Sequence, residues 1–375
     1  KEDRTSGSST TQFQYGVEYT LTVTGFASNA NQVKIRIPAG LVTDDYDNGN
    51  ISTDMIVYNT LKKTYTGEYS EPNSESSPEA PFLGNSKIQR QNIDNLTFVN
   101  NIPADVGYDS KTNKYKNATA WDVSAMQDKS ILAWYTTNAN GSLHLYIGSD
   151  SEIFANQDST DLFSYIGYST KCTSTETITN IDLLNVASVK SMNQMFRYTG
   201  YNAMTELDLG SKFYTSNVVD MIGMFDATGF NAMTTLNLGN NFNTSNVIYM
   251  QYMFLNCGYV KLASLNLGNN FDTSNVIDMK YMFLNTGYTA MTSLNLGNNF
   301  DTSNVTNMKY MFCNLGMNAL KSLNLGNNFD TSNVTNMYRM FYNCGYSKMT
   351  TLNLGNKFNT SKVTDMQKMF EGCGY

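Results

Sequence analysis

The chain has 375 residues, of which 32 are acidic and 25 are basic, so its formal net charge is -7. This charge disfavours a nucleic-acid partner, because phosphates are held mainly by Lys and Arg. Hydrophobic residues make up 41% of the chain, which excludes a mainly disordered protein, and it contains no apolar run long enough for a membrane-spanning helix.

The residue types that common catalytic sites need are scarce. His144 is the single histidine, and the five cysteines include no C-x-x-C pair. A Ser/His/Asp triad or a multi-histidine zinc site is therefore excluded unless His144 itself takes part. A pair of catalytic carboxylates stays open, but no spacing singles one out. We expect a protein that is not an enzyme and that carries no metal or cofactor.

Apolar and polar residues alternate from Val17 to Val42, which predicts two half-buried antiparallel strands, and Ile56 to Tyr65 is a candidate for another. We expect residues 1–68 to form a small all-β, immunoglobulin-like (Ig-like) domain. Its acidic run at 44–50 is typical of a hairpin turn. A calcium loop is the alternative, but Tyr46 stands where an oxygen ligand belongs.

Residues 69–81, YSEPNSESSPEAP, hold three of the five prolines together with Ser and Glu. This composition predicts an extended linker. We interpret residues 82–180 as the N-terminal cap of the repeats that follow, because the first turn of a solenoid needs its apolar edge covered. The side chains expected to cover it are Trp121, Trp134, Phe154, Leu162 and Phe163.

A repeat of 29 residues fills the C-terminal half, and 19 of the 21 methionines lie in it. Its most regular marker is a leucine, which recurs at Leu207, Leu236, Leu265, Leu294, Leu323 and Leu352. A shortened copy precedes these six from Ile181 to Tyr201. The copy at 320–328 opens with L-x-x-L-x-L-x-x-N, which matches the leucine-rich-repeat pattern.

Each copy is predicted to contain a strand and a short helix. The Leu-Asn-Leu piece places both leucines on one side of a strand. Val276, Met279, Met282 and Phe283 follow the spacing of one helix face. Because one copy cannot bury this face alone, the copies must stack. We therefore predict an α/β leucine-rich-repeat solenoid over 181–375, with a parallel concave sheet, convex helices and a Met-rich core.

The run Ala120-Trp121-Asp122-Val123-Ser124 and the repeated Asp-Thr-Ser-Asn-Val..Met..Met-Phe motif resemble the BspA-like leucine-rich-repeat surface proteins of bacteria. The resemblance covers about residues 82–375. It implies secretion, display at the cell surface and, in some members, adhesion to host proteins. It implies no catalytic residues, and residues 1–80 lie outside it.

Stacking brings equivalent residues of successive copies into columns, two of which are candidate binding sites. The outward strand residues form a nearly uniform polar lattice that includes Asn266, Asn295 and Asn324. A second column follows a Gly in every copy and consists of Tyr201, Phe230, Tyr259, Tyr288, Met317, Tyr346 and Tyr375. Aromatic side chains are frequent in interface hot spots. We predict that Tyr259, Tyr288 and Tyr346, with these asparagines, contact a host protein. The alternative is that each ring only packs against the next turn.

Three further columns have structural interpretations. The first is expected to start each helix, with a bound cation as the alternative, and consists of Asp272, Asp301 and Asp330. The second is expected to satisfy backbone groups between turns and consists of Asn241, Asn270, Asn299 and Asn328. Cys257, Cys344 and Cys373 share the third, where we expect buried free thiols, with a Cys344–Cys373 disulfide as the alternative.

We therefore predict a secreted or cell-surface adhesin that acts as a monomer and presents its repeats to a host extracellular or surface protein, without membrane insertion of this segment. A structural spacer or self-association module on the cell wall is the alternative, and a surface hydrolase ranks below both. The chain begins with Lys1 and stops at Tyr375 just after a predicted helix, so we expect it to be a processed piece of a longer protein, truncated at its C-terminus.

Overall fold

The computed structural model describes residues 33–37, 53–57, 60–62, 81–82 and 85–375. The chain divides into two compact units, Lys1–Tyr58 and Asn59–Tyr375. In the first unit, β1 (Val33–Ile37) and β2 (Thr53–Val57) pair antiparallel. β1 lies within the predicted alternating stretch, and β2 begins shortly before the predicted Ile56. The remainder of the expected Ig-like domain, the acidic run 44–50 and most of the linker at 69–81 lie outside the described residues.

The second unit includes residues that we assigned to the small β domain. The N–H of Leu61 donates to the carbonyl of Phe154 at 2.9 Å, and the Leu61 side chain is buried in the core of this unit. The unit therefore begins before the expected boundary at residue 68.

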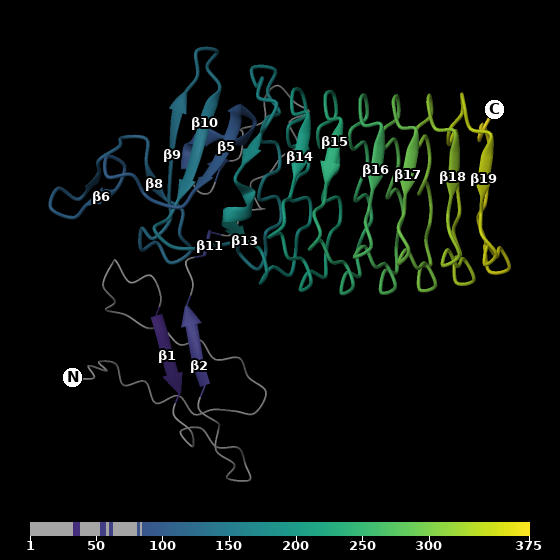
Figure 1. The fold of residues 1–375 in the computed structure, drawn as a ribbon, viewed down its shortest axis with the longest axis horizontal. Coiled ribbons are helices and arrows are strands. Elements are labelled where there is room, and N and C mark those ends of the chain that lie inside the picture. The colour runs from purple at the N-terminus through teal and green to yellow at the C-terminus, as the bar shows by residue number, and fades with distance from the viewer. Residues whose placement is uncertain (1–32, 38–52, 58–59, 63–80, 83–84) are drawn as a thin grey trace, which may run out of the picture. The chain divides into compact units, whose positions relative to one another are not determined.

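A mixed five-stranded sheet forms the N-terminal part of this unit, in the order β12-β5-β10-β9-β8 (Figure 1). Its strands are β5 (Ile93–Val99), β8 (Trp121–Asp122), β9 (Leu132–Thr137), β10 (Leu143–Gly148) and β12 (Ile178–Thr179). β10 runs parallel to β5 and antiparallel to β9. Alternate side chains such as Leu96, Phe98, Leu145 and Ile147 are buried, because successive residues of a strand point to opposite faces.

Short elements surround this sheet. They are β3 (Pro81–Phe82), β4 (Asn85–Gln89), the 3-10 helix η1 (Arg90–Asn92), β6 (Tyr108–Asp109) and β7 (Lys114–Tyr115). Trp134 packs with Val106 and Leu132 in a small separate cluster. Trp134, one of the five side chains expected to cover the repeats, therefore packs in this separate cluster and not against the repeats.

The stacked coils begin inside the expected cap. β11 (Ile153–Phe154) pairs in parallel with β13 (Leu184–Asn185), which follows the 3-10 helix η2 (Ile181–Leu183). Phe163 stacks on Phe196 of the first copy, with ring centroids 5.2 Å apart. A partial coil at residues 153–168 thus covers the apolar edge of the first copy by continuing its columns.

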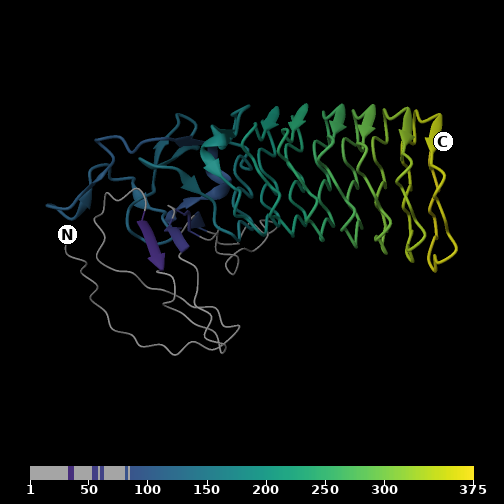
Figure 2. The ribbon, with the colours of Figure 1, turned by 60° about the horizontal axis from the view of Figure 1, so that its bottom comes forward.

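The six full copies contribute six short parallel strands. They are β14 (Glu206–Asp208), β15 (Thr235–Asn237), β16 (Ser264–Asn266), β17 (Ser293–Asn295), β18 (Ser322–Asn324) and β19 (Thr351–Asn353). Leu207 lies opposite Leu236, so the register equals the 29-residue period. The predicted parallel strands are confirmed, but they form three two-stranded sheets rather than one continuous sheet. The strands lie in a row along one edge of the repeats (Figure 2).

The predicted convex helices are wrong. The N–H groups of Met282 and Leu284 donate to the carbonyls three residues before them, whereas the N–H groups of Tyr281 and Phe283 donate to carbonyls of the next copy. An α-helix needs every N–H on the carbonyl four residues back. Tyr281 also has φ 62°, in the left-handed region that ends a right-handed helix. The apolar spacing therefore reflects a series of turns, and the repeats are β-rich rather than α/β.

Within the described residues the helices are the two short 3-10 turns η1 and η2. None is long and apolar enough to cross a membrane.

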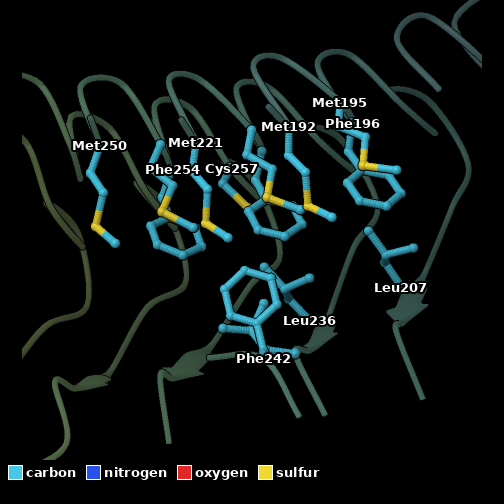
Figure 3. Close-up of a cluster of buried hydrophobic side chains, with 14 of the residues drawn as sticks. Met192, Met195, Phe196, Leu207, Met221, Leu236, Phe242, Met250, Phe254 and Cys257 are labelled. Carbon is cyan, nitrogen blue, oxygen red and sulfur yellow. The ribbon is translucent and has the colours of Figure 1, made fainter. Parts of the chain in front are cut away.

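The core of the repeats is made of methionine and phenylalanine columns, as predicted. Met192, Met221 and Met250 are 0% exposed and lie side by side in a row across Figure 3, near Phe196 and Phe254. The phenylalanine rings stack between copies, with centroids 5.4 Å apart for Phe254 and Phe283. Such ring pairs add about 0.5–1.5 kcal/mol beyond the area they bury. Methionine fills the remaining gaps because its side chain is unbranched and flexible.

Candidate functional site

The strand asparagines form an exposed and pre-ordered row. Asn266, Asn295 and Asn324 are exposed, whereas the Leu between the outward residues of each strand is buried. The Oδ1 of Asn295 accepts a hydrogen bond from the N–H of Gly297 at 3.0 Å, and its Nδ2 donates to the Oδ1 of Asn266 at 3.2 Å. These bonds fix the amide orientation, so the strand face presents a regular polar surface at low entropic cost.

The predicted tyrosine column, here called the loop-edge column, is continuous over its first four members. The rings of Tyr259 and Tyr288 are 4.6 Å apart and nearly parallel, at 6°. Both side chains are half-buried. Tyr346 stacks instead on Tyr375, at 5.3 Å, and Met317 occupies the position between Tyr288 and Tyr346. The structure therefore brings two of the three predicted tyrosines together and places the third two copies away.

A glycine is required immediately before each loop-edge residue. Gly287 has φ +50°, and a Cβ there would lie 2.8 Å from the carbonyl oxygen of Leu262. Close approach of the preceding copy therefore needs a residue without a side chain. Burial raises the pKa of Tyr259, and the neighbouring Tyr288 raises it further through its charge and a side-chain hydrogen bond, so the Tyr259 phenol is protonated at neutral pH.

A second tyrosine column, here called the turn-face column, was missed from the sequence. It consists of Tyr252, Tyr281 and Tyr310, whose rings stack at 5.0 Å, with Tyr338 edge-on to Tyr310 at 5.3 Å. Lys280, Lys309 and Arg339 lie over rings of this column. The sequence does contain a sign of this column, because Tyr252, Tyr281 and Tyr310 are spaced 29 residues apart. The predicted helix, however, gave no reason to expect successive copies to align their outer residues ring on ring.

The aspartate column closes turns. The Oδ1 atoms of Asp272, Asp301 and Asp330 accept hydrogen bonds from the N–H two residues ahead, at 2.8–2.9 Å. No helix follows, so the expected helix-starting role is wrong and the local role is that of an Asx turn. In the described part of the chain, no group of three or more His, Cys, Asp or Glu side chains is arranged to hold a metal ion.

The DUF285 family model, described as a Mycoplasma protein of unknown function, matches residues 166–290 and 258–374. Together the two matches cover more than half of the chain. The chain belongs to the DUF285 family. No curated protein and no solved structure matches it significantly.

The DUF285 repeats are held together by side-chain amides and hydroxyls. The predicted role of the Asn241 column is confirmed: Asn299 donates from Nδ2 to the carbonyl of Asn269 in the preceding copy at 2.7 Å. Asn285 likewise donates to the Oδ1 of Asn256 at 2.8 Å. These bonds satisfy loop groups that stacking would otherwise leave unpaired.

The cysteines of the DUF285 segment are free thiols. Burial raises the pKa of Cys257 and raises the pKa of Cys313 to about 12. Since the thiolate is the reactive form, these thiols are poor nucleophiles at neutral pH. Cys344 and Cys373 differ, because the Cys344 thiol donates a hydrogen bond to the Cys373 sulfur, which raises the pKa of Cys344 and lowers the pKa of Cys373.

Three titratable side chains N-terminal to the DUF285 matches, those of Arg90, Asp161 and His144, make hydrogen bonds or ion contacts within the cap. Arg90 is buried and donates from Nη1 to the carbonyl of Asp161 and to the Oγ of Ser164. Burial lowers the pKa of Arg90 to about 10 and, opposed by that guanidinium, raises the pKa of Asp161. Burial also lowers the pKa of His144, whose ring nitrogens lie 2.9 Å from the Thr97 hydroxyl and 3.3 Å from the Tyr146 hydroxyl.

Proposed function

We propose that this chain is a BspA-like leucine-rich-repeat surface protein that is displayed outside the cell and binds a host extracellular or surface protein. The DUF285 match supports this proposal, because BspA-like proteins carry DUF285 repeats. The loop-edge column and the row of strand asparagines also support it, because the same repeats carry both. An Ig-like fold for the first unit, Lys1–Tyr58, belongs to the same proposal and is supported by the antiparallel pair β1–β2.

The observation that carries the binding proposal is the stacked, half-buried pair Tyr259–Tyr288 five residues before each exposed strand. A ring clamped between neighbours loses little further freedom on binding, so its exposed edge supplies contact area at low entropic cost. The phenol oxygens of Tyr259 and Tyr288 add polar atoms to this edge.

The strand asparagines supply the polar part of this surface. Their oxygens are engaged by Gly N–H groups, and Asn295 also donates one amide N–H to Asn266, so the remaining amide N–H groups are the donors offered to a partner. A uniform lattice favours many weak contacts over one deep pocket, so binding strength is expected to grow with the number of copies engaged. The protein acts as a monomer in this proposal.

The test is a binding screen of the purified chain against extracellular-matrix and mucosal proteins by surface plasmon resonance. For a partner that binds, the double variant Tyr259→Ser/Tyr288→Ser should weaken binding about tenfold or more, and Asn295→Ala should weaken it less. Tyr346→Ser, two copies away, reports how far the contact extends.

The matched control is Tyr214→Ser/Tyr249→Ser, which removes two phenols that are 47% and 40% exposed and lie outside the loop-edge column. Equal losses in both double variants, or a large drop in thermal stability with Tyr259→Ser/Tyr288→Ser, would identify the loop-edge column as core packing. Analytical ultracentrifugation separates the adhesin from a self-associating spacer, because a spacer forms oligomers and binds no host protein.

A further inference from the structure

The turn-face column carries cations that are not matched by acids. Lys309 lies 5.7 Å from the ring centre of Tyr310 and 5.4 Å from that of Tyr338. The Arg339 guanidinium lies 5.7, 5.2 and 4.9 Å from the ring centres of Tyr310, Tyr338 and Tyr342. Among the residues that the structure describes, neither cation forms an ion pair, whereas Lys280 pairs with Asp278 at 3.5 Å.

The guanidinium of Arg339 uses few of its five N–H hydrogen-bond donors. Its Nη1 donates to the Tyr310 hydroxyl at 3.4 Å, and its Nε is buried without a hydrogen-bond partner. Three tyrosine rings hold the group in place, so its planar fork is pre-organised. A guanidinium fixed in this way favours an anion that accepts two parallel hydrogen bonds, such as a carboxylate or a sulfate.

The ring geometry determines what else this face can bind. The rings of Tyr252, Tyr281 and Tyr310 stack on one another at 5.0 Å, so the faces of Tyr281 are covered on both sides. Single-stranded nucleic acids bind by stacking successive bases on open aromatic faces, and the covered faces of Tyr281 interrupt any such series along this column. It offers ring edges and phenol hydroxyls in a row.

The spacing of the row also disfavours an acidic peptide. Side chains on one side of an extended peptide recur about every 6.7 Å, whereas the tyrosine rings recur every 5.0 Å. A linear polysaccharide carries hydroxyls on every sugar ring, and these accept and donate hydrogen bonds without the fixed two-residue period of a strand.

We propose that the turn face around Tyr281, Lys309, Tyr310 and Arg339 binds an acidic linear polysaccharide. Lys309 and Arg339 pair with its carboxylate or sulfate groups, and the phenol hydroxyls bind its ring hydroxyls. This surface and its ligand class are separate from the loop-edge column and the host protein of the preceding proposal. The net charge of -7 makes the two uncompensated cations a local feature, and their attraction for the glycan is screened by salt.

The test is isothermal titration calorimetry of the full chain with hyaluronan oligosaccharides, which carry carboxylates, and heparin oligosaccharides, which also carry sulfates. Neutral dextran and poly-L-glutamate are the comparison probes. We expect binding of at least one acidic glycan, weaker binding at higher ionic strength, and no comparable binding of dextran or poly-L-glutamate. Tighter binding of hyaluronan or of heparin then identifies the anionic group that the site prefers.

Two variants locate the site. Arg339→Gln/Lys309→Gln should weaken acidic-glycan binding about tenfold or more, because two charge-assisted contacts are lost. Arg339→Lys keeps the charge but loses the bidentate fork, and it should show an intermediate loss. Circular dichroism and a thermal scan show whether each variant is folded.

The matched control is Lys261→Gln/Lys348→Gln, which removes the same charge from exposed positions outside the turn-face column. It should leave glycan binding within about twofold of the wild type. The proposal is overturned if no acidic glycan binds, if poly-L-glutamate or dextran binds as tightly, or if the control variant loses as much affinity as Arg339→Gln/Lys309→Gln.

Discussion

The hydroxyl of Thr273 donates a 2.7 Å hydrogen bond to the carbonyl oxygen of Asp301, in the next copy of the repeat. Both the hydroxyl and its methyl group are buried, since Thr273 is 0% exposed. The same bond recurs at the equivalent position of every neighbouring copy, from Thr215, Thr244, Thr302 and Thr331. Each coil is thus joined to the next by a side chain as well as by its backbone.

Thr273→Val should lower the free energy of unfolding by about 1–2 kcal/mol, because the shape of the buried side chain is kept while the part-buried carbonyl of Asp301 loses its donor. Thr292→Val is the matched control, since the Thr292 hydroxyl makes a 3.2 Å bond at an exposed position; its effect should stay within about 0.5 kcal/mol. Urea denaturation followed by circular dichroism measures both changes. Equal effects at the two positions would contradict the role given to the buried bond.

Phe283→Ala should destabilise the chain by about 3–5 kcal/mol, because the ring is 0% exposed and stacks on Phe254 and on Phe312 at 5.4 and 5.5 Å. Phe370→Ala provides the comparison in the same column, where the ring is 44% exposed and, among the residues that the structure describes, stacks only on Phe341. Its cost should be less than half that of Phe283→Ala. Denaturant midpoints of the two variants give the difference directly.

The strands and the core were predictable because their signals are local. In Ser293-Leu294-Asn295-Leu296 the two leucines are two residues apart, which places both on one face whatever the rest of the coil does. The identity of equivalent residues over 29 positions then fixes the register, so that Leu207 faces Leu236 and Leu265 faces Leu294. Stacking of the methionines follows from the same translation.

The turns between Met279 and Tyr288 were mistaken for a helix because both arrangements bury residues three and four apart. What separates them is the direction of the N–H groups, and that depends on a carbonyl of the next copy, such as Lys309 for the N–H of Tyr281. A single copy carries no sign of this partner. The left-handed conformation of Tyr281 is also uncommon for an aromatic residue, so its residue type did not indicate a turn.

The loop-edge column was predicted from the sequence, whereas the turn-face column was hidden by the mistaken helix. Tyr259 and Tyr288 follow a glycine in each copy, and that glycine marks a turn at which successive chains approach closely. Tyr281 and Tyr310 fall inside the supposed helix. Only the lateral hydrogen bonds of the true turns bring these two rings to 5.0 Å and set Lys309 against them.

Asp301→Asn should be nearly neutral, within about 0.5 kcal/mol, because Asn243 and Asn359 accept the same N–H hydrogen bond at the equivalent positions of other copies. Asp301→Ala removes the acceptor and should cost about 1 kcal/mol. Adding millimolar calcium to the wild type should leave its melting temperature unchanged. A clear rise with calcium that Asp301→Asn abolishes would show that the aspartate column holds a cation after all.

Cys373 should be the most reactive of the DUF285 cysteines. Donation of a hydrogen bond by the Cys344 thiol lowers the pKa of Cys373, so more of it is thiolate at a given pH, and its side chain is half-buried rather than buried. Burial raises the pKa of Cys257 and raises the pKa of Cys313 to about 12, which leaves both thiols almost wholly protonated at pH 8.

Treatment of the native chain with iodoacetamide at pH 8, followed by peptide mass spectrometry, should therefore label Cys373 first. Cys344→Val removes the donor and should slow the labelling of Cys373 severalfold, whereas Cys257→Val, four copies away from Cys373, should leave the rate unchanged. Labelling of Cys257 or Cys313 at the rate of Cys373 would show that the repeats open locally to solvent and that burial does not protect their thiols.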